Sequence, residues 1–434
     1  MPRILLLATT TGYQTRAFGD AAEILGAELV FATDRCHMLE DPWQDAAIPI
    51  RFHDEDGSVA AILDPARTCP FVGVVAVGDR PTVIAARVAE QVGLPGHPPE
   101  AVAIARDKQR MRECLRAAGL PVPWFLPLRI DDDPRWFLSN VSFPCVVKPV
   151  SLSASRGVMR ADDPEGFHTA FSRLRNLLAL PDVRAERNPA HDRVLVEGFI
   201  PGREFALEGL LQHGQLTVLA LFDKPDPLDG PFFEETIYVT PSRLPAQVQQ
   251  RIADAVGRAA AAIGLRHGPI HAECRVNDRA VFVLEIAARP IGGLCARSLR
   301  FETRGRERPF SLEELVLRHA MGEPLDAWSR EACASGVMMI PIPERGVYRG
   351  VSGLDEARRV VGIDDVTMTA KADQLLVPLP EGASYLGFIF AHGDGPELVD
   401  RSLRDAHARL RFTIEPELRV VGADQMGYTG QHHG

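Results

Sequence analysis

Hydrophobic residues gather in short runs along the first hundred residues, and polar loops separate these runs. Apolar runs at 4–8, 28–32 and 71–77 predict strands, and the segments between and after them carry helical periodicity, as at 85–92. Strands that alternate with helices are typical of a parallel, doubly wound sheet. The N-terminal region, residues 1–100, is therefore predicted to be an α/β domain of this class.

Beyond residue 100 the apolar pattern mixes long helices with strands. The predicted helices are 101–118, 246–264 and 398–410, and the predicted strands are 143–150, 193–197, 205–211, 336–341, 374–377 and 386–391. Residues 177–190 are predicted to be an exposed connector. The character changes again near residue 330, after which Gly and Pro turns separate the strands. This mixture predicts α+β architecture for the rest of the chain.

Two carboxylates stand in a predicted β-hairpin at 271–287. A turn-like stretch at 277–280 separates two segments with strand propensity, and a three-residue loop at 278–280 would set Glu273 opposite Glu285. Strand alternation then predicts that both carboxylates share one face. The residues predicted for the opposite face are Cys274, Phe282, Leu284 and Ile286.

Two such carboxylates repel each other, by roughly 4 kcal/mol at ~4 Å and an effective dielectric of about 20. A cation between them would relieve this repulsion, and Mg²⁺ prefers carboxylate and phosphate oxygens. Arg289, just beyond the second strand, suits two-point contact with a phosphoryl or carboxylate group. The pattern therefore fits a metal–nucleotide site, and it fits equally a solvated hairpin face.

A lysine near the end of a predicted strand, Lys148, is followed by the small-residue loop 151–157. A buried lysine needs an anionic partner, and small residues let backbone amides approach phosphate oxygens. This segment is a candidate phosphate lid, although a lysine that points outward from a strand end gives the same pattern. The segment Glu197 to Glu204 links two strands and could meet a base and a ribose, as could any strand–turn–strand unit.

Composition narrows the classes of function. The 434-residue chain has a formal net charge of -10, which argues against a nucleic-acid partner, and no apolar run approaches the ~20 residues of a membrane span. Seven scattered cysteines without Cys-x-x-Cys favour a reducing, cytoplasmic location and argue against zinc. The loop at 9–13 lacks Gly-x-Gly-x-x-Gly, which weakens a nicotinamide oxidoreductase. The tail at 427–434 is predicted to be frayed.

Taken in order, these motifs form a set: a helix lysine, a strand lysine with its small-residue loop, Glu-x-x-x-Pro-Gly-x-Glu, Glu273, and Glu285-Ile-Ala-Ala-Arg289. The set resembles the ATP-grasp superfamily over roughly residues 1–330. The resemblance implies an N-terminal domain at 1–100, a two-lobed ATP-grasp domain at 101–330 with a lid at about 120–198, and a C-terminal α+β domain at 331–434.

The resemblance also implies roles for individual residues. The lysines would contact the ATP phosphates, the loop would close over the β- and γ-phosphates, and the hinge would meet adenine and ribose. The residues implied for ATP are Lys108, Lys148, Ser151, Ser153, Ser155, Gly157, Glu197, Phe199 and Glu204. Glu273 and Glu285 would bind Mg²⁺ or Mn²⁺, and Arg289 would stabilise an acyl phosphate.

Position 287 departs from the family pattern, because an alanine stands where many members carry a metal-binding asparagine. Within the superfamily, Glu-x-Ala-x-Arg together with Phe222-Asp-Lys-Pro225 and 233–244 resembles the L-amino acid ligases. That likeness makes Glu235 a further candidate for the metal or the substrate amine, although a solvated loop acid has the same pattern. It places His271, Gly292 and Gly293 beside the reacting carboxylate, whereas His271 also fits an ordinary strand histidine.

The sequence thus predicts an ATP-dependent ligase that activates a carboxylate as an acyl phosphate and joins it to an amine, with Arg289 and Lys148 as catalytic residues. The expected partners are a small carboxylic acid and an amine that is an amino acid, with no nucleic acid and no membrane; a homodimer follows the family's habit. Two alternatives stay open: a ligase or carboxylase of nucleotide or cofactor biosynthesis that activates another acid, such as bicarbonate, and a non-catalytic ATP-binding module.

Overall fold

The computed structural model describes residues 1–9, 14–34, 47–303, 308–324 and 328–417. Most of the predicted loop at 9–13, Cys36 and the predicted frayed tail at 427–434 lie outside the described residues. The N-terminal region contains a four-stranded sheet in the order β3-β2-β1-β4, and its strands are parallel. Its elements are β1 (Arg3–Ala8), α1 (Thr15–Leu25), β2 (Glu28–Thr33), β3 (Ile48–Pro49), α2 (Glu55–Ala66), β4 (Gly73–Val77) and α3 (Thr82–Gln91). The predicted doubly wound parallel sheet is confirmed.

The predicted single helix at 101–118 is wrong, because the chain breaks it at Asp107. This residue has an extended backbone, and its side chain accepts a hydrogen bond from the Arg110 amide, so it ends one helix and caps the next. The two helices are α4 (Pro99–Arg106) and α5 (Lys108–Ala117). The break places Lys108 at the start of α5, where its side chain is buried.

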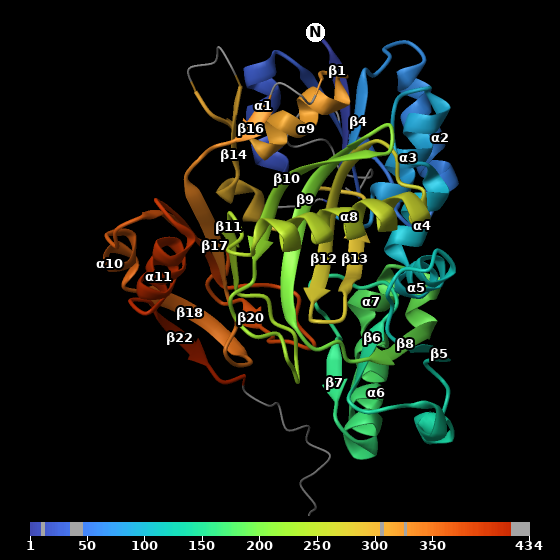
Figure 1. Ribbon diagram of the computed structural model, residues 1–434. Helices are drawn as coiled ribbons and strands as arrows, with labels where there is room; N and C mark the ends of the chain where they lie inside the picture. The colour runs from blue at the N-terminus through green and yellow to red at the C-terminus, as the bar shows by residue number, and fades with distance from the viewer. Residues whose placement is uncertain (10–13, 35–46, 304–307, 325–327, 418–434) are drawn as a thin grey trace, which may run out of the picture.

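A smaller four-stranded sheet, in the order β5-β8-β6-β7, forms the body of the predicted lid (Figure 1). Its elements are β5 (Phe125–Arg129), η1 (Pro134–Asn140), β6 (Cys145–Pro149), β7 (Met159–Ala161), α6 (Pro164–Leu178), α7 (Pro181–Ala185), η2 (Pro189–Asp192) and β8 (Arg193–Gly198). The prediction of an exposed connector at 177–190 is wrong. Leu177, Leu178 and Val183 are almost fully buried in this lobe's core, because the segment ends α6 and includes α7.

The large central sheet has eight strands in the order β13-β12-β9-β10-β11-β17-β21-β19. In Figure 1 it runs through the middle of the molecule, with α8 lying across it. The elements are β9 (Arg203–Gln212), β10 (Gln215–Asp223), β11 (Ile237–Thr240), α8 (Ala246–Ile263), β12 (Gly268–Val276), β13 (Val281–Ala287), β17 (Ala334–Ile340), β19 (Ile363–Met368) and β21 (Gly387–Gly393). Since β11 pairs with β17, this sheet continues across residue 330. The division into domains at 100 and 330 stays a prediction.

The remaining elements surround these sheets. They are η3 (Cys295–Ser298), β14 (Arg300–Thr303), β15 (Phe310–Ser311), α9 (Leu312–Ala320), β16 (Trp328–Arg330), β18 (Gly346–Ser352), α10 (Leu354–Arg358), β20 (Leu375–Leu376), α11 (Pro396–His407) and β22 (Arg411–Glu415). None of the described helices combines the length and apolar character that crossing a bilayer demands.

One hydrophobic core joins the N-terminal sheet to the central sheet. Ile4 and Leu6 of β1 belong to the same buried cluster as Phe222 of β10 and Phe388 of β21. This shared packing fixes the end of β4 beside the end of β13. The position of the site follows from this contact, because residues from both ends reach one cavity.

Candidate active site

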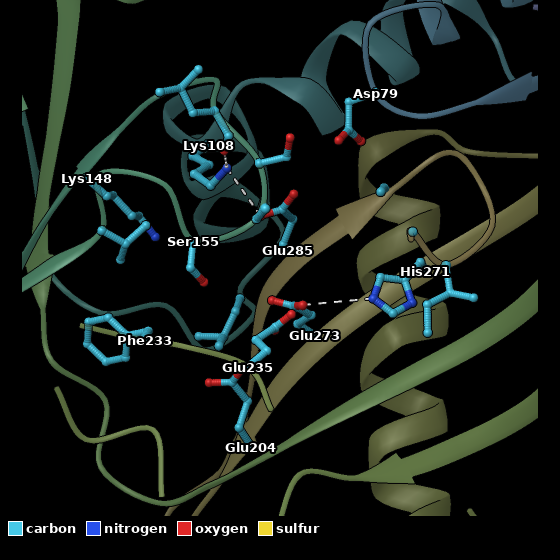
Figure 2. A pocket seen from close by; sticks show the side chains of 18 of the residues that line it. Asp79, Lys108, Lys148, Ser155, Glu204, Phe233, Glu235, His271, Glu273 and Glu285 are labelled. Carbon is cyan, nitrogen blue, oxygen red and sulfur yellow. Dashed lines mark hydrogen bonds and ion pairs between the residues drawn. The ribbon is translucent and has the colours of Figure 1, made fainter. Parts of the chain in front are cut away.

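A cavity of about 330 Å³ lies between the lid sheet, the central sheet and the loop after β4. Figure 2 shows side chains from all three parts turned toward it. The predicted residues that line it are Lys108, Lys148, Ser153, Ser155, Glu197, Phe199, Glu204, Glu235, His271, Glu273, Glu285, Arg289, Gly292 and Gly293. Residues spread over more than 180 positions of the chain thus converge on a single cavity.

The hairpin of β12 and β13 places Glu273 directly opposite Glu285, as predicted. The turn of this hairpin differs from the prediction. Val276 pairs with Val281, so the loop between them has four residues rather than three. A bulge after Glu273 restores the predicted pairing, since one residue of β13 is skipped there. That residue, Leu284, lines the cavity, so its predicted place on the opposite face is wrong.

Glu285, one of the two opposed carboxylates, has a lysine as its cationic neighbour. The Lys108 ammonium lies 3.2 Å from Glu285 Oε2 and donates a hydrogen bond to the Leu152 carbonyl oxygen at 2.9 Å. Glu285 therefore faces a lysine in the cavity. When a phosphate binds in the cavity, the Lys108 ammonium can donate a hydrogen bond to its oxygens.

Arg289 is held by a residue that the sequence did not single out. Its Nε and a terminal nitrogen donate to the two oxygens of Asp79, at 2.8 and 3.2 Å. Burial disfavours the Arg289 cation, but the charge of Asp79 raises the pKa of Arg289 above its usual value. Burial would likewise raise the pKa of Asp79, yet Arg289 lowers it. The only sequence signal for Asp79 was its place directly after the third N-terminal strand.

Lys148 and Glu197 form a buried ion pair across the lid strands β6 and β8. Arg112, which is fully buried, donates to Glu197 at 3.0 Å and to the Leu284 carbonyl oxygen at 2.9 Å. Burial lowers the pKa of Lys148 to about 8, although Glu197 opposes the shift. Burial works against the charged form of Glu197, but Arg112 and Lys148 lower its pKa to about 2. The Glu197 carboxylate is therefore occupied by two cationic partners.

Three carboxylates, those of Glu204, Glu235 and Glu273, lie with ligand oxygens within 4.8 Å of one another. Among the described residues this is the one such group of three or more. Its oxygens are the hard donors that Mg²⁺ prefers, so the residues fit a divalent ion. Glu285, a predicted ligand, is not part of the group, because its side chain pairs with Lys108.

Lys224 stands at the centre of this acidic group and was missed by sequence reasoning, although it lies in a quoted motif. Its ammonium is 2.8 Å from Glu204 and 3.2 Å from Glu273, and it also pairs with Glu235. Burial disfavours its charge, but these carboxylates raise its pKa well above the usual value. Burial and the nearby Glu273 charge raise the pKa of Glu235 to about 8.

Glu204 differs from the free ribose acceptor that was expected. One of its oxygens accepts from Lys224 and the other accepts from Arg275 Nε at 3.0 Å. Phe199 stacks on Phe233 with ring centres 6.4 Å apart, and the Arg275 guanidinium lies 5.1 Å from the Phe199 ring. These rings give the cavity an apolar wall beside the hinge.

His271 and Glu208 form a buried pair beneath the cavity. His271 Nδ1 lies 3.1 Å from a Glu208 oxygen, and the other Glu208 oxygen accepts from the Ile291 amide at 3.1 Å. Burial disfavours the charged ring, but Glu208 and Glu273 raise the pKa of His271 to about 9. Glu208 thereby ties the histidine to the backbone that leads into Gly292, a function that sequence reasoning did not assign.

The small-residue loop reaches the cavity only in part. Ser153 and Ser155 line it, and the latter has a left-handed backbone with φ 53°. Ser151 instead accepts a hydrogen bond from Asn188 at 2.9 Å, and the Gly157 amide donates to the Pro380 carbonyl oxygen at 2.8 Å. Neither Ser151 nor Gly157 lines this cavity, because both ends of the loop are anchored elsewhere, and their contact with phosphates stays a prediction.

Family models match three parts of the chain: an ATP-grasp N-terminal domain at 19–96, an ATP-grasp domain at 141–298 and an L-amino acid ligase C-terminal domain 2 at 338–415. The chain belongs to the ATP-grasp family. The predicted family is thus confirmed, as is the mixed α/β and α+β fold.

Curated ATP-grasp relatives carry ligase names. The alanine–anticapsin ligase of Bacillus subtilis is 27% identical over 223 residues, which cover 48% of this chain and 46% of that protein. The D-alanine–D-alanine ligase of Desulforudis audaxviator is 31% identical over 238 residues, covering 52% of this chain and 72% of that protein. These names agree with the predicted enzyme class. The match spans less than half the length of the anticapsin ligase.

Solved structures show the same fold over nearly the whole chain. The L-amino acid ligase of Bacillus licheniformis superposes with a TM-score of 0.77 at 24% identity, covering 96% of this chain and 99% of that one. N5-carboxyaminoimidazole ribonucleotide synthetase of Thermotoga maritima gives a TM-score of 0.67 at 16% identity, covering 96% and 100%. A biotin carboxylase domain of Hydrogenobacter thermophilus with this fold, with a TM-score of 0.62 at 16% identity, was solved with MgADP and bicarbonate.

Proposed function

We propose that this protein is an ATP-dependent, ADP-forming carboxylate–amine ligase that joins an acid to an amino acid. The observation that carries the proposal is the convergence on one cavity of Lys108, Lys148, Glu273, Glu285 and Arg289. Lysines, paired carboxylates and an arginine are the groups that phosphoryl transfer to a carboxylate needs. The match of residues 338–415 to the L-amino acid ligase C-terminal domain supports the amino-acid class of substrate.

In the first step the substrate carboxylate attacks the γ-phosphorus of ATP, the bond to the β-phosphate oxygen breaks, and ADP leaves. Lys108 and Lys148 would offset the charge of the triphosphate, and the loop with Ser153 and Ser155 would cover it. A divalent ion, when bound, would neutralise phosphate charge, and Glu273 and Glu285, with Glu235 as the further candidate, would hold it. This chain contributes mainly positioning and charge neutralisation.

In the second step an amine attacks the acyl carbon, the C–N bond forms, and the C–O bond to phosphate breaks. Arg289 is proposed to stabilise the acyl phosphate and the oxyanion, with the backbone amides of Gly292 and Gly293 as further donors. Burial disfavours the charged ring of His271, but Glu208 and Glu273 raise its pKa to about 9. The ring would therefore add positive charge beside these donors. Glu235, whose pKa is about 8, is the candidate that contacts the substrate amine and accepts its proton.

The test measures phosphate release from ATP with Mg²⁺ and pooled amino acids, followed by mass analysis of the product. We expect acid-dependent release and a new amide. Glu285→Gln should abolish ADP release, whereas the matched control Glu302→Gln, an exposed glutamate of β14, should retain it. A fully active Glu285→Gln variant would refute the assigned role.

A second candidate is a ligase or carboxylase that activates another acid, such as bicarbonate. The fold shared with N5-carboxyaminoimidazole ribonucleotide synthetase favours including it. ADP release with bicarbonate alone, and none with amino acids, would replace our proposal with this one. Absence of ADP release with every acid tested would point instead to a non-catalytic nucleotide-binding module. The cytoplasmic location and the homodimer stay predictions.

A further inference from the structure

A side cavity of about 80 Å³ adjoins the main cavity behind Glu285. Figure 2 shows Lys108 and Glu285 near this end of the main cavity, with Asp79 beyond them. The residues that line both spaces are Asp79, Lys108, Leu152, Ser153, Glu285 and Ala287. A substrate that occupies the main cavity can therefore extend a short group into the side cavity.

Most charged side chains around the side cavity have an oppositely charged partner. The pairs are Asp79 with Arg289, Lys108 with Glu285 and Arg80 with Asp34. Glu186 lies 3.4 Å from His191, but burial lowers the pKa of His191, so this contact does not join two charged groups. The Arg106 guanidinium makes no hydrogen bond or ion pair with any residue that the structure describes. Burial lowers the pKa of Arg106, against the smaller opposing effects of Asp79, Glu55 and Glu186.

The backbone fixes Arg106 at this place. It is the last residue of α4, and Asp107 directly after it caps α5 and accepts an ion pair from Arg193 at 2.6 Å. A half-buried guanidinium without a partner is unfavourable, because it has lost water without gaining an acceptor. Its planar donors match the two oxygens of a carboxylate. The donors of Arg106 are thus available to an anion that enters the side cavity.

We propose that Arg106 binds the free carboxylate of the amine-donating substrate in this side cavity. The inference rests on the proposed ligase function and deepens it, because it limits the amine to molecules that also carry a carboxylate, such as amino acids. Holding that carboxylate would orient the amine toward the acyl carbon. Arg106 is therefore a specificity-determining residue of the second step, with no part in the first.

The terminal phosphate of ATP has similar anionic chemistry, so the experiment must separate the two sources. Hydroxylamine is an amine without a carboxylate, and it converts an acyl phosphate into a hydroxamate. The rate of hydroxamate formation therefore reports acyl phosphate formation and transfer to an amine, without a contact between Arg106 and a substrate carboxylate. An amino acid and its carboxamide, used as amine donors, then differ only in the carboxylate.

Arg106→Gln should raise KM for the amino-acid donor about 10- to 100-fold, which is the loss typical of a hydrogen bond to a charged group. KM for the carboxamide donor, KM for ATP and the rate of hydroxamate formation should change less than about twofold. Arg106→Lys keeps the charge but lacks the fork, so it should recover part of the affinity. The control is Arg110→Gln, since Arg110 pairs with Glu100 at the surface.

Equal losses with hydroxylamine and with the amino acid, or a raised KM for ATP in Arg106→Gln, would overturn the inference, because they indicate a phosphate contact or a structural role. An unchanged KM for the amino acid would also overturn it. If the wild-type protein forms no hydroxamate with any acid, the proposed function fails first and this inference fails with it. That outcome is recognised without any variant.

Discussion

Arg289 and Asp79 join the end of the central sheet to the end of the N-terminal sheet through two hydrogen bonds of 2.8 and 3.2 Å. Their positions differ by 210 in the sequence. The pair holds the guanidinium in one orientation at the cavity wall. The N-terminal region thus contributes directly to the geometry of the proposed reaction.

Asp79→Asn should lower kcat about 10- to 100-fold, because a neutral amide cannot accept both charge-assisted hydrogen bonds from Arg289. KM for ATP should change less than about twofold, since Asp79 acts through Arg289 and the nucleotide is held elsewhere. Steady-state kinetics with separately varied ATP and acid check this split. Asp56→Asn is the control, because Asp56 is 89% exposed and pairs with a surface arginine. A rise in KM for ATP with unchanged kcat would contradict the role.

Much of the site could be predicted from the sequence, because its residues lie in local patterns. The pairing of Glu273 with Glu285 followed from the hairpin, although a four-residue loop and a bulge replaced the three-residue loop. The motif order then located Lys148 and Arg289. These predictions depended on neighbours within one or two strands, for which periodicity is informative.

The partners of these residues could not be predicted, because they come from distant parts of the chain. Asp79 reaches Arg289 only through the packing of two sheets, and Arg112 of α5 reaches Glu197 of β8. Lys224 fills the acidic group from a neighbouring strand end. The break at Asp107 was missed for a different reason. A single extended residue interrupts helical periodicity too briefly to disturb the pattern.

Lys148 should make ATP binding depend on pH. Its pKa of about 8 means that the ammonium is present below pH 8 and is lost as the pH rises through this value. Bound phosphate favours the charged form, so KM for ATP should rise above pH 8 by at most about tenfold per pH unit. Kinetics between pH 6.5 and 9.5 test this. Lys148→Arg keeps its charge throughout and should flatten the profile; an identical rise in that variant would assign the effect to another group, such as Glu235.

Lys224→Met should make the protein's stability depend more strongly on Mg²⁺. Without the ammonium, Glu204, Glu235 and Glu273 lose the cation that they share, although Glu204 keeps its bond to Arg275. Loss of one member of a buried ionic cluster costs about 3–5 kcal/mol. A divalent ion that binds the folded state would offset this loss, so Mg²⁺ should raise the melting temperature of the variant more than that of the wild type. Lys371→Met, at an exposed lysine, is the control. Equal Mg²⁺ responses in all three proteins would show that the ion does not bind this acidic group.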